Sequence, residues 1–213
     1  MYKLYKLASF RLTQKLGVVA LSACLLAPAA QATAQRVEVS FPSSVHATPI
    51  TGRVILIVAK DSAREPRFRA GGYGGTEPFF GLDVSALAPG ATATIDASTS
   101  GYPFTLAHLP AGDYYVQAVL NVYTQFHRAD GHVIWGHMDQ WEGQHWNTSP
   151  GNLVTSVRRV HIDPRTPINL KLSLNRVLPP LPAPIDTKWV KHVKIQSKLR
   201  TAFWGHPIYI GAT

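Results

Sequence analysis

Cysteine is almost absent from this chain of 213 residues, which holds Cys24 and no other thiol. A disulfide within the chain needs two thiols, so a disulfide framework is excluded. Cys24 lies in an N-terminal segment that we expect to be removed. If it is cleaved, a thiolate metal site and a cysteine nucleophile are excluded as well.

Helical periodicity and catalytic motifs are also missing. No apolar repeat of helical period lasts longer than a turn or two. The sequence has no G-x-S-x-G elbow, no H-E-x-x-H pair and no complete set of Ser, His and acid in a credible context. Asp139 and Glu142 are two acids three positions apart on an expected loop, where carboxylates are usually solvated. Catalysis is therefore the weakest interpretation of these residues.

The formal charge of +9 is unevenly distributed. The first 35 residues carry four cations and no acid, and the residues after Asn175 carry six cations against Asp186 alone. The central part of the chain is therefore neutral. A nucleic-acid-binding domain shows a basic face on the folded domain itself, so we expect no nucleic-acid partner.

Residues 1–34 have the layout of a secretory signal peptide. Cations up to Lys15 precede an apolar stretch, and Ala32-Thr33-Ala34 offers a cleavage site that would make Gln35 the first mature residue. Leu21-Ser22-Ala23-Cys24 also resembles a lipobox, in which Cys24 would be lipidated. Both alternatives predict a periplasmic or secreted protein, with membrane attachment only if Cys24 carries lipid.

The run LPAGDYYVQAVLNVYTQF, residues 109–126, predicts the strand around which the fold is organised. Pro110, Gly112 and Asp113 form a turn, and a long alternating pattern follows. One face of that strand is wholly apolar and the other is mixed, as in a central strand with one face on a core. The apolar face comprises Tyr114, Val116, Ala118, Leu120 and Val122.

Further strand patterns recur about every ten residues between Pro, Gly and Asp turns. They predict an all-β fold, an immunoglobulin-like or transthyretin-like β-sandwich with a C-terminal extended tail. We expect the sandwich over 35–177, a Pro-rich linker over 178–187 and a separate piece over 188–213. The apolar strand expected at Pro207–Thr213 has no visible partner in the sequence.

The candidate binding residues lie in one loop-rich region. Imidazole and carboxylate groups are ligands for zinc or a similar divalent metal, and the metal candidates are His127, His132, His137 and Asp139. Tryptophan beside acid and amide groups can instead stack on sugar rings, and the candidates for ligand binding are Trp135, Trp141, Trp146 and Glu142. Neither pattern has a diagnostic spacing, so both alternatives stay open. No other cofactor is expected.

Several segments carry a family resemblance. ITGRVILIVAKD, HLPAGDYYVQAVLNVYTQFHRADGH, HMDQWEGQHWNTSPGNL, VRRVHIDP and the tail IQSKLRTAFWGHPIYIGAT resemble the N-terminal part of secreted bacterial esterases with an arrangement similar to that of enterochelin esterases. In those proteins a β-sandwich precedes an α/β-hydrolase domain. The resemblance implies that residues 188–213 are the start of a hydrolase domain, truncated before its nucleophile.

The resemblance therefore implies an exported, non-catalytic accessory module whose partner is an α/β-hydrolase domain. No catalytic residue carries over to this chain. Two alternatives remain: an independent module of the cell envelope that binds glycan or metal, and a structural envelope protein that only packs against partners.

Overall fold

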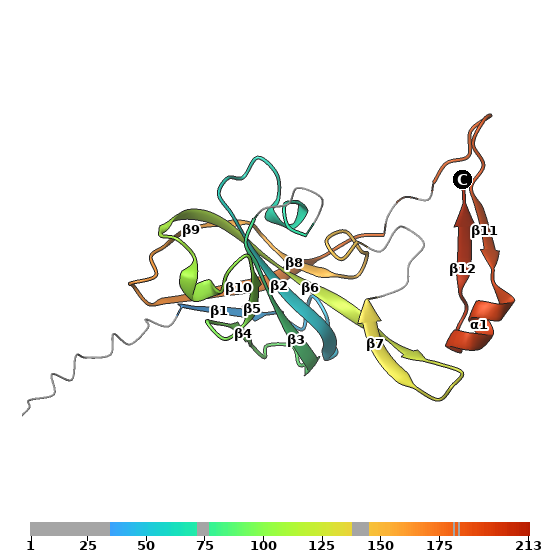
Figure 1. The fold of residues 1–213 in the computed structure, drawn as a ribbon, viewed down its shortest axis with the longest axis horizontal. Helices are drawn as coiled ribbons and strands as arrows, with labels where there is room; N and C mark the ends of the chain where they lie inside the picture. The colour runs from blue at the N-terminus through green and yellow to red at the C-terminus, as the bar shows by residue number, and fades with distance from the viewer. Residues whose placement is uncertain (1–34, 72–76, 138–144, 181, 183) are drawn as a thin grey trace, which may run out of the picture. The chain divides into compact units, whose positions relative to one another are not determined.

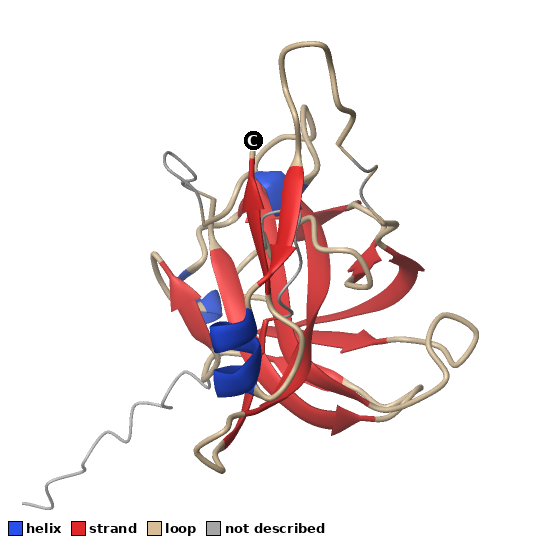
Figure 2. Cartoon of the chain, turned by 90° about the vertical axis from the view of Figure 1, so that its right-hand side faces the viewer, coloured by secondary structure: helices blue, strands red, loops and turns tan. Residues whose placement is uncertain are grey.

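The computed structural model describes residues 35–71, 77–137, 145–180, 182 and 184–213. Contacts group Ala32–Thr213 into one unit. Strands form nearly all of its regular structure (Figure 2), which confirms the all-β prediction. In the part of the chain that is described, no helix is long and apolar enough to cross a membrane.

Strand β6 (Gly112–His127) is the organising element, as its sequence predicts. It pairs antiparallel with β2 (Ile50–Ala59) on one side, and with β9 (Arg158–Ile162) and then β8 (Leu153–Thr155) on the other (Figure 1). Its last residues leave this ladder and pair with β7 (Val133–His137). The turn between β6 and β7 has Gly131 at φ 84°, a conformation that glycine adopts without strain.

One strand pairs with a different strand in each half of its length, and the sheet curls there. The first half of β10 (Ile168–Val177) pairs parallel with β1 (Gln35–Ser40), whereas its last residues pair antiparallel with β8. A register shift between Leu174 and Arg176 interrupts this second pairing. The strand order is β4-β1-β10-β8-β6-β2-β3-β5. The other elements of this sheet and its connections are β3 (Phe79–Leu87), β4 (Ala93–Ile95), β5 (Ser100–Tyr102) and the short 3-10 turns η1 (Pro66–Phe68) and η2 (Leu106–His108).

The main core lies inside this curl. The predicted apolar face of β6 is buried there except for Val122, which is partly buried. Val39 of β1, Leu172 of β10 and Leu56 of β2 belong to the same core. Each such side chain contributes on the order of 1.5–3 kcal/mol by leaving water, so this layer supplies much of the folding free energy.

The opposite face of β6 departs from the prediction. The sequence indicates a strand with one face on a core, yet Gln117 and Asn121 on the mixed face are 0% and 5% exposed. A second, smaller core covers that face and contains Val119, Val154 and Leu178. Polar side chains can be buried here because hydrogen bonds satisfy them, and those bonds shape the candidate site.

The C-terminal segment forms β11 (Val193–Gln196), α1 (Lys198–Trp204) and β12 (Tyr209–Ala212). β12 pairs antiparallel with β11, which corrects the expectation that the last strand has no partner in this chain. The side chain of Ser197 caps α1 by accepting a bond from the Arg200 amide, and Gly205 ends the helix in the left-handed conformation. The segment contacts the β6–β7 turn, where the Ala129 amide donates to the Phe203 carbonyl at 2.7 Å.

Candidate functional site

A cavity of about 310 Å³ lies over the outer face of β2, β3 and β5. Alternate residues of a strand face the same way, so Arg53 and Ile55 of β2 share this face. Phe79 and Gly81 of β3 line it as well, and Phe79 is the Cα partner of Tyr102 on β5. We call this cavity the aromatic pocket; its remaining lining residues are Gly71, Ser100, Gly101 and Trp146.

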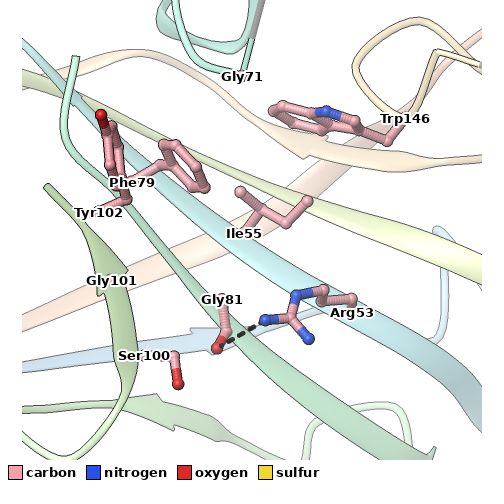
Figure 3. A pocket seen from close by; sticks show the side chains of 9 residues that line it. All are labelled: Arg53, Ile55, Gly71, Phe79, Gly81, Ser100, Gly101, Tyr102 and Trp146. Carbon is pink, nitrogen blue, oxygen red and sulfur yellow. Dashed lines mark hydrogen bonds between the residues drawn. The ribbon is translucent and has the colours of Figure 1, made fainter. Parts of the chain in front are cut away.

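One end of the aromatic pocket is built from rings. Phe79 and Tyr102 lie with ring centroids 6.0 Å apart, and Trp146 faces them across Ile55 (Figure 3). Tyr102 is 61% exposed, whereas Trp146 is half-buried against the smaller core. The rings thus present accessible apolar faces on two sides of one hollow.

The other end is polar but neutral. Arg53 Nη1 donates to both carboxylate oxygens of Asp83 at 2.8 Å, and Nη2 lies 3.5 Å from the Gly81 carbonyl. A Cβ atom at Gly81 would lie 2.6 Å from the Arg53 guanidinium, so the absent side chain makes room for it. Because Asp83 already balances the charge of Arg53, this end offers donors and acceptors without a net charge.

This arrangement suits a neutral ligand that has both apolar faces and hydroxyl groups. Aromatic rings pack on the C–H faces of a sugar, and the Arg53 guanidinium supplies hydrogen-bond donors for its hydroxyls. An anion would have to compete with Asp83 for the guanidinium. The geometry therefore favours a carbohydrate over a charged ligand.

A buried amide cluster fixes the loop that carries Trp146. It consists of Asn121, His137, Ser149 and Asn152. Asn152 Oδ1 accepts from the Val122 amide at 2.9 Å, and its Nδ2 donates to the Trp146 carbonyl at 2.7 Å and to Asn121 Oδ1 at 3.1 Å. This cluster ties the pocket wall to the central strand.

The hydrogen bonds of the amide cluster determine which ring nitrogen of His137 carries a proton. Asn152 must present its oxygen to the Val122 amide, so its nitrogen faces Asn121 and Asn121 presents an oxygen to His137 Nδ1 at 2.7 Å. His137 Nδ1 therefore carries a proton, and Nε2 lies 3.0 Å from Ser149 Oγ.

Serine, histidine and an amide in this order resemble a nucleophile with its base, but the arrangement does not expose the serine. Ser149 is only 3% exposed, and its Oγ also lies 3.0 Å from the His145 carbonyl. A nucleophile must reach its substrate, so we interpret the amide cluster as structural.

A second cluster holds the other side of the loop. The backbone N–H of Arg67 donates to Gln117 Oε1, and Gln117 Nε2 donates to Glu65 at 2.9 Å. The Arg67 guanidinium donates to the Asn147 carbonyl, and Asn147 Nδ2 donates to the Arg67 carbonyl at 3.0 Å. Asn147 is the neighbour of Trp146, so both clusters position the same wall of the pocket.

The carboxyl group of Glu65 is strongly acidic. Burial alone would raise its pKa, but hydrogen bonds from Gln117 and Arg67 and the charge of Arg176 outweigh burial and lower the pKa to about 2. Glu65 is therefore ionised throughout the physiological range and holds the two arginines in place.

The predicted ligand-binding tryptophans do not all lie in the same site. Trp146 lines the aromatic pocket, whereas Trp135 is 50% exposed on β7 and is not part of that lining. Trp141 and Glu142 lie outside the described residues.

The predicted metal ligands that the structure describes lie in different surroundings and have different hydrogen-bond partners. His127 is exposed at the end of β6, His132 lies 3.2 Å from Asp130 in the turn, and His137 belongs to the amide cluster. Asp139 lies outside the described residues. Among the described residues, no group of three or more His, Cys, Asp and Glu side chains could hold a metal ion. The metal site stays a prediction.

Arg53, Phe79 and Tyr102 could not be identified as site residues from the sequence. No local signal marks them, because they meet only through the strand register. Asn121 did carry a signal, since a polar side chain within an apolar strand requires a partner.

No family model, curated protein or solved structure matches this chain. The all-β assignment therefore rests on the strand pairing described above.

Proposed function

We propose that this chain is an exported, non-catalytic accessory β-sandwich module of an esterase-like protein, and that it positions substrate by holding a carbohydrate in the aromatic pocket. The observation that carries this proposal is the pocket itself, with Tyr102 and Trp146 on either side of Ile55 and the neutral Arg53–Asp83 pair at one end. The resemblance in the sequence supplies the esterase-like partner.

The C-terminal segment supports the accessory role. Among the described residues, fifteen large hydrophobic side chains are exposed, and nine of them lie within residues 185–210. Ile208 is the only buried residue described from 184 onward. Such a concentration of exposed apolar groups marks an interaction surface. An α/β-hydrolase domain is the partner that the resemblance implies. The nine residues are Ile185, Trp189, Val190, Val193, Ile195, Leu199, Phe203, Tyr209 and Ile210.

Carbohydrate binding is tested by affinity electrophoresis in gels that contain neutral β-glucan, xylan, mannan or glycol chitin. We expect at least one polysaccharide to retard the wild-type chain, and Tyr102→Ala to reduce its affinity about tenfold, which corresponds to about 1.4 kcal/mol. Trp135→Ala is the matched control, because it removes an exposed tryptophan outside the pocket. Equal mobility of wild type and Tyr102→Ala in every gel would contradict the proposal.

The accessory role has a separate test. The purified chain should not hydrolyse p-nitrophenyl acetate above the rate in buffer, and clear turnover would contradict it. The DNA that follows the codon for Thr213 should encode an α/β-hydrolase with a G-x-S-x-G segment. Its absence would remove the esterase partner but leave carbohydrate binding intact, so the two halves of the proposal can fail independently.

A further inference from the structure

A second cavity of about 310 Å³ has a different chemistry from the aromatic pocket. Its walls include Phe126 of β6, Gly136 of β7, Arg200 and Trp204 of α1, and the following His206 and Ile208. We call it the C-terminal cavity. It shares no lining residue with the aromatic pocket, so a ligand bound there would be distinct from the carbohydrate of the proposed function.

The walls of the C-terminal cavity are apolar and aromatic. Phe126 lies edge-on to Trp204 with ring centroids 6.1 Å apart, and its centroid is 5.0 Å from that of His206. Phe126 and Ile208 are each 7% exposed, so these walls rest on packed side chains. The cavity volume lies at the small end of the range for ligand sites, about 300–1,000 Å³.

Among the described lining residues, the cavity carries a positive charge from Arg200. Arg200 is exposed and, within the described residues, lies within ion-pair distance of no carboxylate. Among the described residues that line the cavity there is no aspartate or glutamate. Arg53 of the aromatic pocket differs in this respect, because Asp83 neutralises it. Arg200 is thus available to an anionic ligand, which a guanidinium can bind through two parallel hydrogen bonds.

His206 supplies an independent indication of a ligand. Its Nε2 atom is buried, and among the described residues it has no hydrogen-bond partner. Buried polar side-chain atoms nearly always have a partner in native proteins, since an unmade hydrogen bond is costly. A ligand oxygen in the cavity that His206 lines would provide one.

We propose that the C-terminal cavity binds a small organic carboxylate with an apolar, preferably aromatic, body. The carboxylate pairs with the Arg200 guanidinium and accepts a hydrogen bond from His206. The apolar body lies against Phe126, Trp204 and Ile208, where it leaves water. A neutral compound of the same shape keeps the apolar contacts and loses the pairing of a carboxylate with Arg200 and His206.

The test is isothermal titration calorimetry of the full chain with 4-phenylbutyrate and with 4-phenylbutanol, its neutral counterpart. We expect the acid to bind at least about tenfold more tightly than the alcohol. Arg200→Gln should reduce the affinity for the acid about tenfold and leave that for the alcohol unchanged. Lys198→Gln is the matched control, because it removes an exposed cation from the same helix outside the cavity lining.

A second variant fills the cavity without changing charge. A Cβ atom at Gly136 would lie 3.7 Å from the Phe126 ring, an ordinary contact, so Gly136→Val adds volume there. It should abolish binding of both compounds, and circular dichroism will show whether the variant is folded. The proposal is overturned if the wild type binds neither compound at about 10 mM, if acid and alcohol bind equally, or if Lys198→Gln weakens binding as much as Arg200→Gln.

Discussion

Asn152 donates a 2.7 Å hydrogen bond from Nδ2 to the main-chain carbonyl of Trp146. The same side chain accepts from the Val122 amide on β6, so a single amide connects the central strand to the wall of the aromatic pocket. The position of Trp146 therefore depends on the interior of the fold as well as on its own loop.

Removing the side-chain amide of Asn152 should lower both the stability of the fold and its affinity for carbohydrate. Asn152→Ala leaves the Val122 amide and Asn121 without their buried partner, and we expect it to lower the free energy of unfolding by about 2–3 kcal/mol. It should also weaken carbohydrate binding, because the Trp146 carbonyl loses its donor. Urea denaturation measures the first effect. Asn175→Ala, on an exposed part of β10, is the control and should change stability by less than about 0.5 kcal/mol.

The proton position on His137 is a second prediction. The bonds of Asn121 and Asn152 require a proton on His137 Nδ1, with Nε2 facing Ser149 Oγ. Two-bond ¹H–¹⁵N correlation spectra of the neutral imidazole should show the Nδ1–H tautomer for His137. The exposed His132 serves as the comparison. A spectrum with the proton on Nε2 would show that the amide cluster is arranged differently.

Glu65 should make stability depend on acid pH. Its pKa is about 2 in the folded chain, below the unfolded value of about 4.3, so its contribution is present above the unfolded value and is lost as the pH falls toward about 2. The side chain is 32% exposed, so water screens part of the effect. We expect Glu65→Gln to cost about 1–2 kcal/mol at neutral pH.

Measuring the unfolding free energies of wild type and Glu65→Gln at lower pH tests whether the charge of Glu65 causes the difference. The difference in unfolding free energy between wild type and Glu65→Gln should shrink as the pH falls from about 4.5 to about 2. A difference that stays constant across this range would mean that the charge of Glu65 does not contribute.

Two glycines of the aromatic pocket should respond differently to a methyl group. At Gly81 the new Cβ meets the end of the flexible Arg53 side chain at 2.6 Å, whereas at Gly101 it meets the buried Phe80 ring at 2.4 Å and the Phe104 carbonyl at 2.6 Å. Gly81→Ala should therefore weaken carbohydrate binding at a stability cost below about 1 kcal/mol, and Gly101→Ala should cost about 1–3 kcal/mol. Thermal unfolding with affinity electrophoresis measures both. Equal stability losses would refute this distinction.

The alternation of apolar and polar residues along the sequence predicted the strands whose burial depends on short-range order. The alternation in residues 109–126 identified β6 and its buried face. The burial of Gln117 and Asn121 could not be predicted in this way, because the segments that cover them come from other parts of the chain.

The candidate site was predicted only in part for the same reason. Trp146 was a candidate because tryptophan beside polar groups suits sugar binding, and it does line a pocket. Its partners there, Arg53, Phe79 and Tyr102, are brought together by the pairing of β2, β3 and β5. Strand register over such separations depends on the whole fold, so short-range patterns in the sequence do not reveal which residues become neighbours.

The central claim is that a carbohydrate binds in the aromatic pocket, and indole ¹H–¹⁵N spectra test it most directly. The chain has five tryptophans, and Trp146→Phe and Trp135→Phe assign two of their signals. Soluble oligosaccharides of glucose, xylose, mannose and N-acetylglucosamine are then titrated into the wild-type chain. We predict that at least one shifts the Trp146 indole signal and leaves that of Trp135 unchanged. A ligand that shifts Trp135 instead, or no shift with any of the sugars, would contradict the claim.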